Sequence, residues 1–352
     1  MNTLGNQIEN CKNNNLNAIR LMLALAVILS HSFPLSLGLG GEARGEPLAS
    51  FTHQQEAFGS VAVNLFFFIS GMLITASWLR SKTMSDFLMK RVLRIYPAFI
   101  TAIGFSGVLI WIFCPEFRAG VGHGIHWSLS LLKDSVFLTY NSLAWHGIFS
   151  GNPFPNTANG SLWTIPIEFL CYLLVAIIGL FCLFKHRLLV LLALLVFFLA
   201  YSKSLFDGAD THFLYRRFLT YFLLGTSVWL WRDKIPFSKW LALGCVVVLL
   251  VASQFKPWFA VLFPILGGYC TLWVGYGLKI NFLNWTEKTD LSYGTYLYAF
   301  PVQQMVAMSS SLRCPWINFL VATPPHFVAG MVELAFGGKA ISRHEEHSPQ
   351  GF

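Results

Sequence analysis

Charged side chains are scarce in this chain. Lys, Arg, Asp and Glu together make up 11% of its 352 residues, whereas a soluble domain carries about 25%. Apolar residues reach 55% and aromatic residues 16%, which leaves too little polar surface to cover a soluble protein of this size. The composition therefore excludes a soluble globular enzyme and a disordered chain, and it favours a polytopic membrane protein.

Cysteine clusters and basic patches are lacking as well. The seven cysteines form no Cys-x-x-Cys pair and no His/Cys spacing typical of a metal site, so we expect neither a disulfide framework nor a bound metal. The net charge of +8 is spread between apolar segments, which argues against a nucleic-acid binder. The first apolar segment is too long for a signal peptide, and the absence of an internal repeat weakens an inverted-repeat transporter.

Long apolar stretches make up most of the sequence. A membrane-spanning helix needs about 20 apolar residues, and the sequence contains about ten such stretches, of which the fifth and seventh are short. They run over Leu16–Leu37, Phe58–Leu79, Ile95–Phe113, Leu162–Phe184, Leu188–Ser202, Phe213–Trp231, Lys239–Ser253, Trp258–Gly277, Leu291–Ser311 and Trp316–Phe336. We therefore predict an all-α polytopic membrane protein, with one transmembrane domain over residues 1–341 and a polar tail over residues 342–352.

The distribution of Lys and Arg predicts the orientation, because cytoplasmic loops carry an excess of both. With the N-terminus in the cytoplasm, 16 of the 24 fall on the inner side and 8 on the outer side. This bias favours ten spans with both termini inside. Two outer loops, Gly38–Ala57 and Cys114–Ser161, are then long, and the apolar segment His126–Tyr140 in the second suggests an interfacial or re-entrant helix.

Ionisable groups inside spanning helices are costly and usually functional. Arg20 and His31 lie eleven residues apart in the first stretch, a separation that places them on one face of an α-helix, about 16 Å apart along its axis. Arg20 alone is equally consistent with a cytoplasmic anchor whose charge snorkels to the surface. His31 alone is consistent with a structural histidine, but the two aligned side chains favour a site.

Two further groups of ionisable residues are candidates. Glu168 is the single acid in the fourth stretch, about a turn and a half into the expected helix, and Pro166 is expected to kink the helix beside it. This carboxylate is either functional or a structural partner of a buried cation. Arg91 and Arg94 share a helical face at the inner mouth of the third stretch, where phosphate binding and lipid-headgroup anchoring are equally consistent with them.

Five segments carry a family resemblance. They are Asn17–Pro34 with its Arg20 and His31, Ala62–Gly71 with Phe-Phe-x-x-Ser-Gly, Phe87–Pro97 ending in Arg-Ile-Tyr-Pro, Ser161–Tyr172 with Ser-Leu-Trp and Glu168, and Leu291–Tyr298. In this order they resemble the membrane acyltransferase-3 family of bacterial O-acyltransferases, particularly those that acetylate O-antigen and other surface polysaccharides. The resemblance covers about residues 15–335.

The resemblance implies an enzyme of the bacterial inner membrane that moves an acyl group, commonly acetyl, from cytoplasmic acyl-CoA to a hydroxyl of a lipid-linked or surface glycan. His31 would be the general base or acyl relay, and Glu168 a second catalytic candidate. Acetyl-CoA would be a co-substrate and not a permanently bound cofactor. Arg20, Arg91 and Arg94 would bind the donor, and the substrate-binding or structural candidates are Asn64, Ser70, Trp163, Tyr172 and Tyr296.

Two positions depart from the family pattern, and other functions stay open. Asn64 stands where many relatives have Asp, and only Glu333 matches the pattern expected of the last helix. A transporter or flippase of a lipid-linked or small polar substrate is the alternative, with the buried Arg, His and Glu as coupling groups. A non-catalytic membrane scaffold is a third interpretation.

Overall fold

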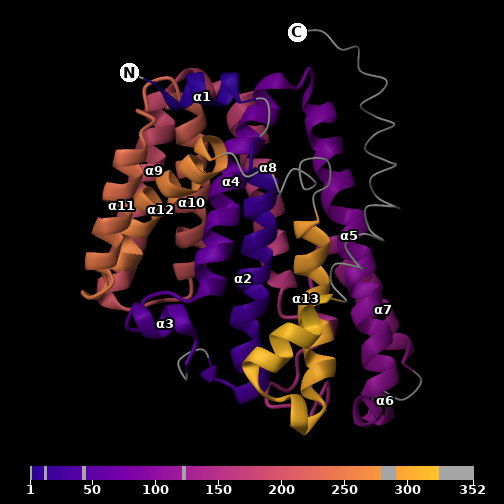
Figure 1. Cartoon of the computed structure of the whole chain (residues 1–352). Helices are drawn as coiled ribbons and strands as arrows, with labels where there is room; N and C mark the ends of the chain where they lie inside the picture. The colour runs from indigo at the N-terminus through magenta and orange to yellow at the C-terminus, as the bar shows by residue number, and fades with distance from the viewer. Residues whose placement is uncertain (1, 12–13, 42–44, 121–123, 279–290, 325–352) are drawn as a thin grey trace. The chain divides into compact units, whose positions relative to one another are not determined.

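The computed structural model describes residues 2–11, 14–41, 45–120, 124–278 and 291–324. Within these ranges the regular structure is helical, apart from one isolated β-bridge between Thr3 and Pro236 (Figure 1). This confirms the all-α prediction for the described part of the chain. The polar tail, Glu333 and the second half of the tenth stretch lie outside the described residues.

Six helices among the described residues are long and apolar enough to cross a membrane, which supports a multi-pass membrane protein. They are α2 (Leu16–Leu37), α4 (Phe58–Arg80), α5 (Met84–Phe113), the run Leu162–Leu180 formed by η3 (Leu162–Thr164) and α8 (Ile165–Leu180), α9 (Arg187–Asp207) and α12 (Trp258–Gly277). The other expected stretches contain α10 (Phe213–Trp231), α11 (Lys239–Ala252), α13 (Ser292–Ala307) and a helix that begins at residue 315. The number of crossings and their orientation stay predictions.

The chain divides into two compact units. The first comprises Met1–Leu23, Pro47–Leu88 and Leu170–Thr289, and the second comprises Ala24–Glu46, Met89–Phe169 and Asp290–Phe352. Helices α2, α5 and α8 contribute residues to both units.

In the first unit α10 packs against α4 and α9, and α11 packs against α12 (Figure 1). Glycines let α4 and α10 cross closely: a Cβ on Gly71 would lie 2.0 Å from the carbonyl oxygen of Phe222. A Cβ on Gly225 would lie equally close, at 2.0 Å, to the carbonyl oxygen of Phe68. Small residues serve this purpose between membrane helices. Gly71 ends the Phe-Phe-x-x-Ser-Gly segment, so the structure gives this motif a packing role.

Gly71→Ala should therefore destabilise the first unit. The added methyl group overlaps backbone atoms of α10, and we expect a loss of about 1–3 kcal/mol, the usual range for overpacking. Gly244 of α11 is the matched control, because a Cβ there meets no atom within 4 Å. Thermal unfolding of the detergent-solubilised protein should show a lower midpoint for Gly71→Ala and no loss for Gly244→Ala. Equal midpoints for Gly71→Ala and the unchanged protein would contradict the close crossing.

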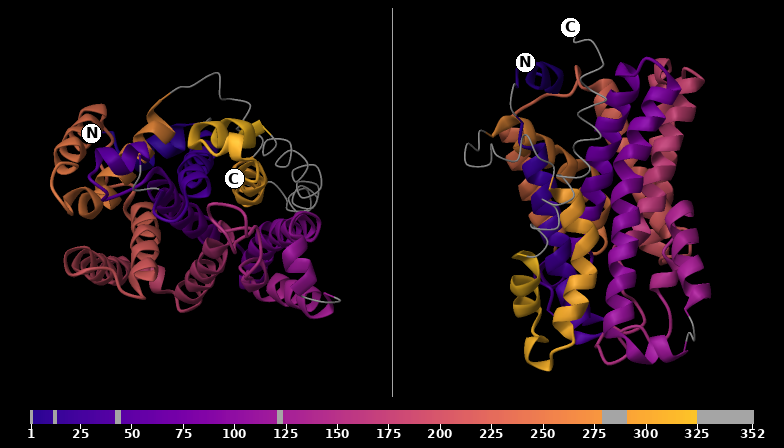
Figure 2. Two further views of the ribbon diagram at one scale, coloured as in Figure 1. Left: turned by 90° about the horizontal axis from the view of Figure 1, so that it is seen from below. Right: turned by 90° about the vertical axis from the view of Figure 1, so that its right-hand side faces the viewer.

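The second unit contains the helix expected in the second long loop. This helix, α7 (Ile125–Phe137), runs beside α5 (Figures 1 and 2), and the rings of Trp127 and Trp111 stack with centroids 6.2 Å apart. Asp134 of α7 is only 3% exposed. Its carboxylate accepts hydrogen bonds from the Ser142 amide at 2.7 Å and from the hydroxyls of Ser142 and Thr139. This acid therefore closes the turn after α7.

Side chains of helix α13 form hydrogen bonds to several other elements of the second unit. The Tyr298 hydroxyl donates to Thr101 Oγ1 of α5 at 2.8 Å. Gln303 Nε2 donates to the Ile28 carbonyl of α2 at 2.9 Å and to Asn318 Oδ1 at 3.0 Å. These buried side chains fix α13 against α2 one helical turn before His31, since Ile28 and His31 are three residues apart.

Candidate active site

His31 lies in the second unit, near the end of α2. Its ring packs edge-on against Phe300 of α13, with centroids 5.4 Å apart and an interplanar angle of 74°. The ring is half-buried, and its Nδ1 is buried without a hydrogen-bond partner among the described residues. Buried polar atoms normally have partners. This nitrogen is therefore a candidate for exchanging a proton with a bound substrate.

Phe300 is held by the segment that precedes α8. A Cβ on Gly160 would lie 2.7 Å from the Phe300 ring, so only glycine fits there without a shift. The ring of Phe154 packs edge-on against Phe300 at 6.0 Å. The same aromatic side chain is thus in contact with His31 and with the loop before α8.

A buried network fixes the entry into α8. The Tyr296 hydroxyl donates to the Ser161 carbonyl at 2.9 Å and lies 2.9 Å from Thr164 Oγ1. Asn159 Nδ2 donates to the Leu297 carbonyl of α13 at 2.9 Å. The Ser161 hydroxyl itself is buried without a partner in the part of the chain that the structure describes. The Ser-Leu-Trp motif therefore places a second available polar atom in the unit that contains His31.

Glu168 is positioned differently from the expectation. Helix α8 begins at Ile165, so Pro166 is its second residue and Glu168 lies in its first turn. The kink expected at Pro166 is wrong, because proline in the first turn of a helix removes no intrahelical hydrogen bond. An acid is favourable at this end of the helix dipole.

The two arginines of the candidate donor site lie inside α5. This helix begins at Met84, well before the expected third stretch. Their i, i+3 spacing on one helical face is therefore retained. The Arg94 guanidinium lies 5.8 Å from the ring centroid of Tyr293 on α13, and Arg91 Nε is buried. The helix that carries Phe300 thus also contacts Arg94.

The remaining predicted residues divide between the units. The second unit contains His31, Arg91, Arg94, Trp163, Glu168 and Tyr296. The first unit contains Arg20, Asn64, Ser70 and Tyr172. Arg20 and His31 lie on the single helix α2, and Tyr172 is buried, at 1% exposure.

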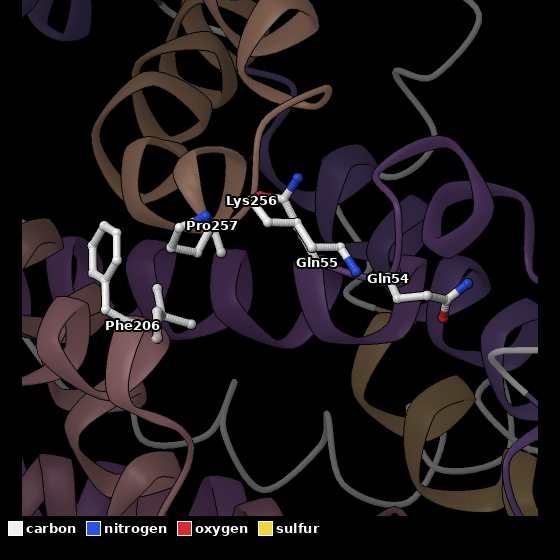
Figure 3. Close-up of a pocket in the computed structure, with 7 residues that line it drawn as sticks. Gln54, Gln55, Phe206, Lys256 and Pro257 are labelled. Atoms are coloured by element: carbon white, nitrogen blue, oxygen red, sulfur yellow. The ribbon is translucent and has the colours of Figure 1, made fainter.

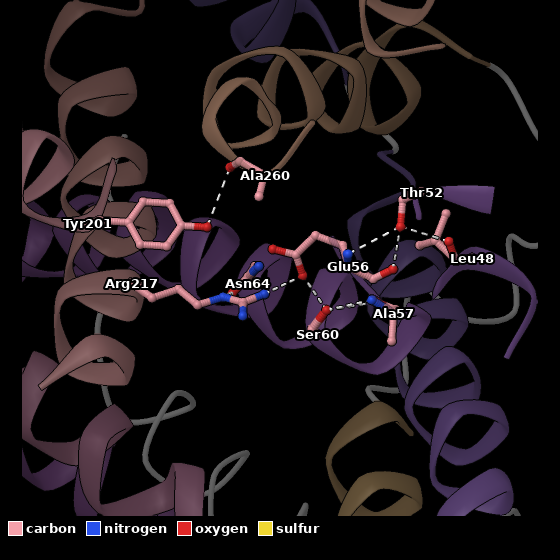
Figure 4. Close-up of polar contacts among 9 residues, drawn as sticks. All are labelled: Leu48, Thr52, Glu56, Ala57, Ser60, Asn64, Tyr201, Arg217 and Ala260. Carbon is pink, nitrogen blue, oxygen red and sulfur yellow. Dashed lines mark hydrogen bonds and ion pairs between the residues drawn. The ribbon is translucent and has the colours of Figure 1, made fainter. Parts of the chain in front are cut away.

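Sequence reasoning missed a buried ion pair in the first unit (Figure 4). Glu56, expected in an outer loop, and Arg217 of α10 are 4% and 9% exposed. Glu56 Oε2 lies 2.5 Å from Arg217 Nη2, and the Ser60 hydroxyl donates to the same carboxylate. Arg217 Nε donates to Asn64 Oδ1 at 2.8 Å. The available signal was the spacing of Ser60 and Asn64, which share one face of α4, with Glu56 four residues before Ser60 and just ahead of the helix start at Phe58.

A cavity of about 440 Å³ opens in the first unit (Figure 3). Lys256 is its one charged lining side chain among the described residues. Gln55 in its wall is already engaged, since its Nε2 donates to the Ser253 carbonyl and its Oε1 accepts from the Phe259 amide, both at 3.0 Å. Lys256 gives the cavity a positive charge, and Gln54 is a second amide in its lining. As for metals, no group of three or more His, Cys, Asp or Glu side chains able to hold an ion is found in the described ranges.

Comparison with known proteins identifies the family. The model of the acyltransferase-3 family, described as an acyltransferase domain, matches residues 13–333. The chain is 29% identical to an O-acetyl transferase of Shigella phage Sf6 over 307 residues, which cover 84% of this chain and 86% of that protein. It is 28% identical to nodulation protein 10 of Rhizobium leguminosarum bv. viciae over 166 residues, which cover 46% of this chain and 42% of that protein.

No solved structure matches the chain. The family match nevertheless spans almost all of it, including every helix that carries a candidate site residue. The chain therefore belongs to the acyltransferase-3 family.

Proposed function

We propose that this protein transfers an acetyl group from cytoplasmic acetyl-CoA to a hydroxyl of a lipid-linked or surface glycan. The family match supports acyl transfer, and the name of the Shigella phage relative, O-acetyl transferase, supports acetyl transfer to oxygen. The observation that carries the chemistry is the buried, unpartnered Nδ1 of His31 among the described residues.

The proposed reaction needs one general base. His31 removes the proton from the sugar hydroxyl as its oxygen attacks the thioester carbonyl. The carbon–sulfur bond then breaks, and the departing thiolate takes the proton back from the imidazolium, so that the products are the acetyl ester and free coenzyme A. The Ser161 hydroxyl, which has no partner among the described residues, is a candidate donor to the carbonyl oxygen, where negative charge develops. Glu168 is a further catalytic candidate, because it is an acid in the same unit as His31.

Donor binding is assigned to the arginines. Arg91 and Arg94 would bind the phosphates of coenzyme A, for which guanidinium groups are well suited, and Arg20 would assist. Membrane lipids and the carbohydrate acceptor are the other expected partners. This scheme places one acyltransferase domain of ten spans, over residues 1–341, in the bacterial inner membrane with both termini inside, as the excess of 16 inner over 8 outer Lys and Arg favours.

Mass spectrometry of the host's surface glycan tests the proposed function. Glycan from cells that express the protein should gain the mass of one acetyl group per modified repeat, and glycan from cells without it should not. Membranes supplied with isotopically labelled acetyl-CoA should transfer the label to the glycan. Movement of a lipid-linked substrate across vesicles without any acyl-CoA, together with an unchanged glycan mass, would instead favour the flippase.

A further inference from the structure

A second cavity lies on the second unit, where the loop Gly147–Asn152 meets the end of α5. Its volume is about 170 Å³, which suits one sugar ring and is too small for coenzyme A. Its walls include Phe113, Glu116, Ser150, Gly151, Asn152 and Met308. We call it the Glu116 cavity.

The polar atoms of the Glu116 cavity are mainly hydrogen-bond acceptors. Glu116 is its one charged lining side chain among the described residues, and its Oε2 accepts from the Ser150 hydroxyl at 2.7 Å. Asn152 Nδ2 is committed to the carbonyl and to Oε1 of Gln304, at 2.8 and 2.7 Å, so the atom that Asn152 can still offer is the acceptor Oδ1. Acceptors bind hydroxyl donors, while the Glu116 carboxylate repels phosphates and uronic acids. Arg313, a cation that contacts the lining, is engaged by the Gly151 and Ala307 carbonyls at 2.8 and 2.9 Å, so the lining selects a neutral sugar.

The loop that lines the Glu116 cavity also contacts the His31 site. Gln304 Nε2 donates to the Phe154 carbonyl at 2.8 Å, and Phe154 packs against Phe300. Phe300 lies one turn before Gln304 on α13 and is the ring on which His31 packs at 5.4 Å. Three contacts thus lead from Gln304, which binds the lining residue Asn152, to the proposed general base.

We infer that the Glu116 cavity binds a neutral sugar residue of the acceptor glycan. That this sugar belongs to the acceptor glycan rests on the proposed function. The binding of a neutral sugar, however, can be measured without any transfer reaction. The wall groups would accept hydrogen bonds from its hydroxyls, and Phe113 and Met308 would contact its apolar face.

Gly151→Phe is the decisive variant. A Cβ on Gly151 meets no atom of the described residues within 4 Å, so the benzyl group can enter the cavity without displacing their backbone. Gly120→Phe is the matched control, because Gly120 is exposed, is equally free of atoms within 4 Å and does not line the cavity. Unchanged thermal midpoints would show that both variants fold.

Saturation-transfer NMR on the full chain in lipid nanodiscs provides the measurement. The probes are the methyl glycosides of glucose, galactose and mannose, with glucuronic acid as the anionic comparison. We expect at least one neutral glycoside to bind the unchanged protein and Gly120→Phe, and to lose its signal with Gly151→Phe. It should bind about threefold to tenfold more weakly to Glu116→Gln, because a charged hydrogen-bond acceptor is replaced by a neutral one. Glucuronic acid should give no signal.

Three results would overturn the inference: no neutral glycoside binds the unchanged protein, Gly151→Phe binds as well as Gly120→Phe, or glucuronic acid binds as well as the neutral glycosides. If Gly151→Phe does not fold, Glu116→Gln becomes the deciding variant. Unchanged binding of the neutral glycosides to Glu116→Gln would then show that Glu116 does not recognise the sugar, and the inference would be wrong. Failure of the proposed function would give a different result: cells that express the protein would contain unacetylated glycan, although the neutral glycosides still bind the protein in nanodiscs.

Discussion

His31→Gln should leave a folded protein that transfers acetyl groups about 10²–10⁴ times more slowly, the usual contribution of a positioned acid–base group. Glutamine approximates the size of histidine but cannot take up a proton near neutral pH. The folded state should lose little, because Nδ1 of His31 makes no hydrogen bond to the described residues and the ring contact with Phe300 is partly replaced by the amide. The effect should therefore be on turnover.

The measurement is the initial rate of label transfer from acetyl-CoA to glycan in membranes with equal amounts of each protein. His126→Gln is the matched control, since His126 is exposed on α7 and should be replaceable without effect. The KM for acetyl-CoA should stay close to that of the unchanged protein. If His31→Gln kept the full rate at equal expression, the general-base assignment would be wrong, and Glu168 would become the leading candidate.

Arg217→Ala should cost about 3–5 kcal/mol of folding stability, the range for breaking a buried ion pair by removing one partner. The Glu56 carboxylate is only 4% exposed and would be left buried without its cation, and Asn64 would lose the guanidinium that donates to it at 2.8 Å. Replacing both charges, with Glu56→Gln and Arg217→Met, should cost less than Arg217→Ala alone, because no uncompensated charge is then buried.

The neighbouring Arg216 provides the control. It pairs with Asp210 at the surface, where the two side chains are 23% and 56% exposed, and exposed pairs contribute at most about 1 kcal/mol. Thermal and denaturant unfolding of the solubilised protein should therefore separate Arg217→Ala sharply from Arg216→Ala. Similar losses for both variants would mean that the buried pair contributes no more than a surface one.

Hydropathy predicted several helices to the residue, and its failures have a physical cause. Leu16–Leu37, Phe213–Trp231 and Trp258–Gly277 were expected and are the observed helices, because each is a long apolar run bounded by polar or turn-forming residues. The start of α5 was missed, since the basic residues before Ile95 are too polar for a membrane core, yet Lys and Arg are good helix formers. A helix can therefore begin outside the apolar core of the membrane, so hydropathy predicts the apolar part of α5 but not its start.

The candidate site was less accessible to sequence reasoning than the fold. Helical spacing relates residues on one element, as for Arg91 and Arg94, but it cannot pair side chains that are distant along the chain. The contacts of Phe300 with His31 and of Gln303 with the Ile28 carbonyl depend on how α13 meets α2. The family resemblance named the relevant helices, and the structure was needed to show which atoms on them lack partners within the described ranges.

The buried ion pair also has a consequence for how the chain is made. Ribosomes synthesise Glu56 first, and Arg217 follows 161 residues later, so a nascent chain that has inserted α4 contains an acid whose cation does not yet exist. Until α10 arrives, this acid has no cation with which to pair, and burying it unpaired would be costly. The first unit therefore cannot complete its core until α10 has been synthesised. Chains truncated before α10 should be targets for membrane proteases.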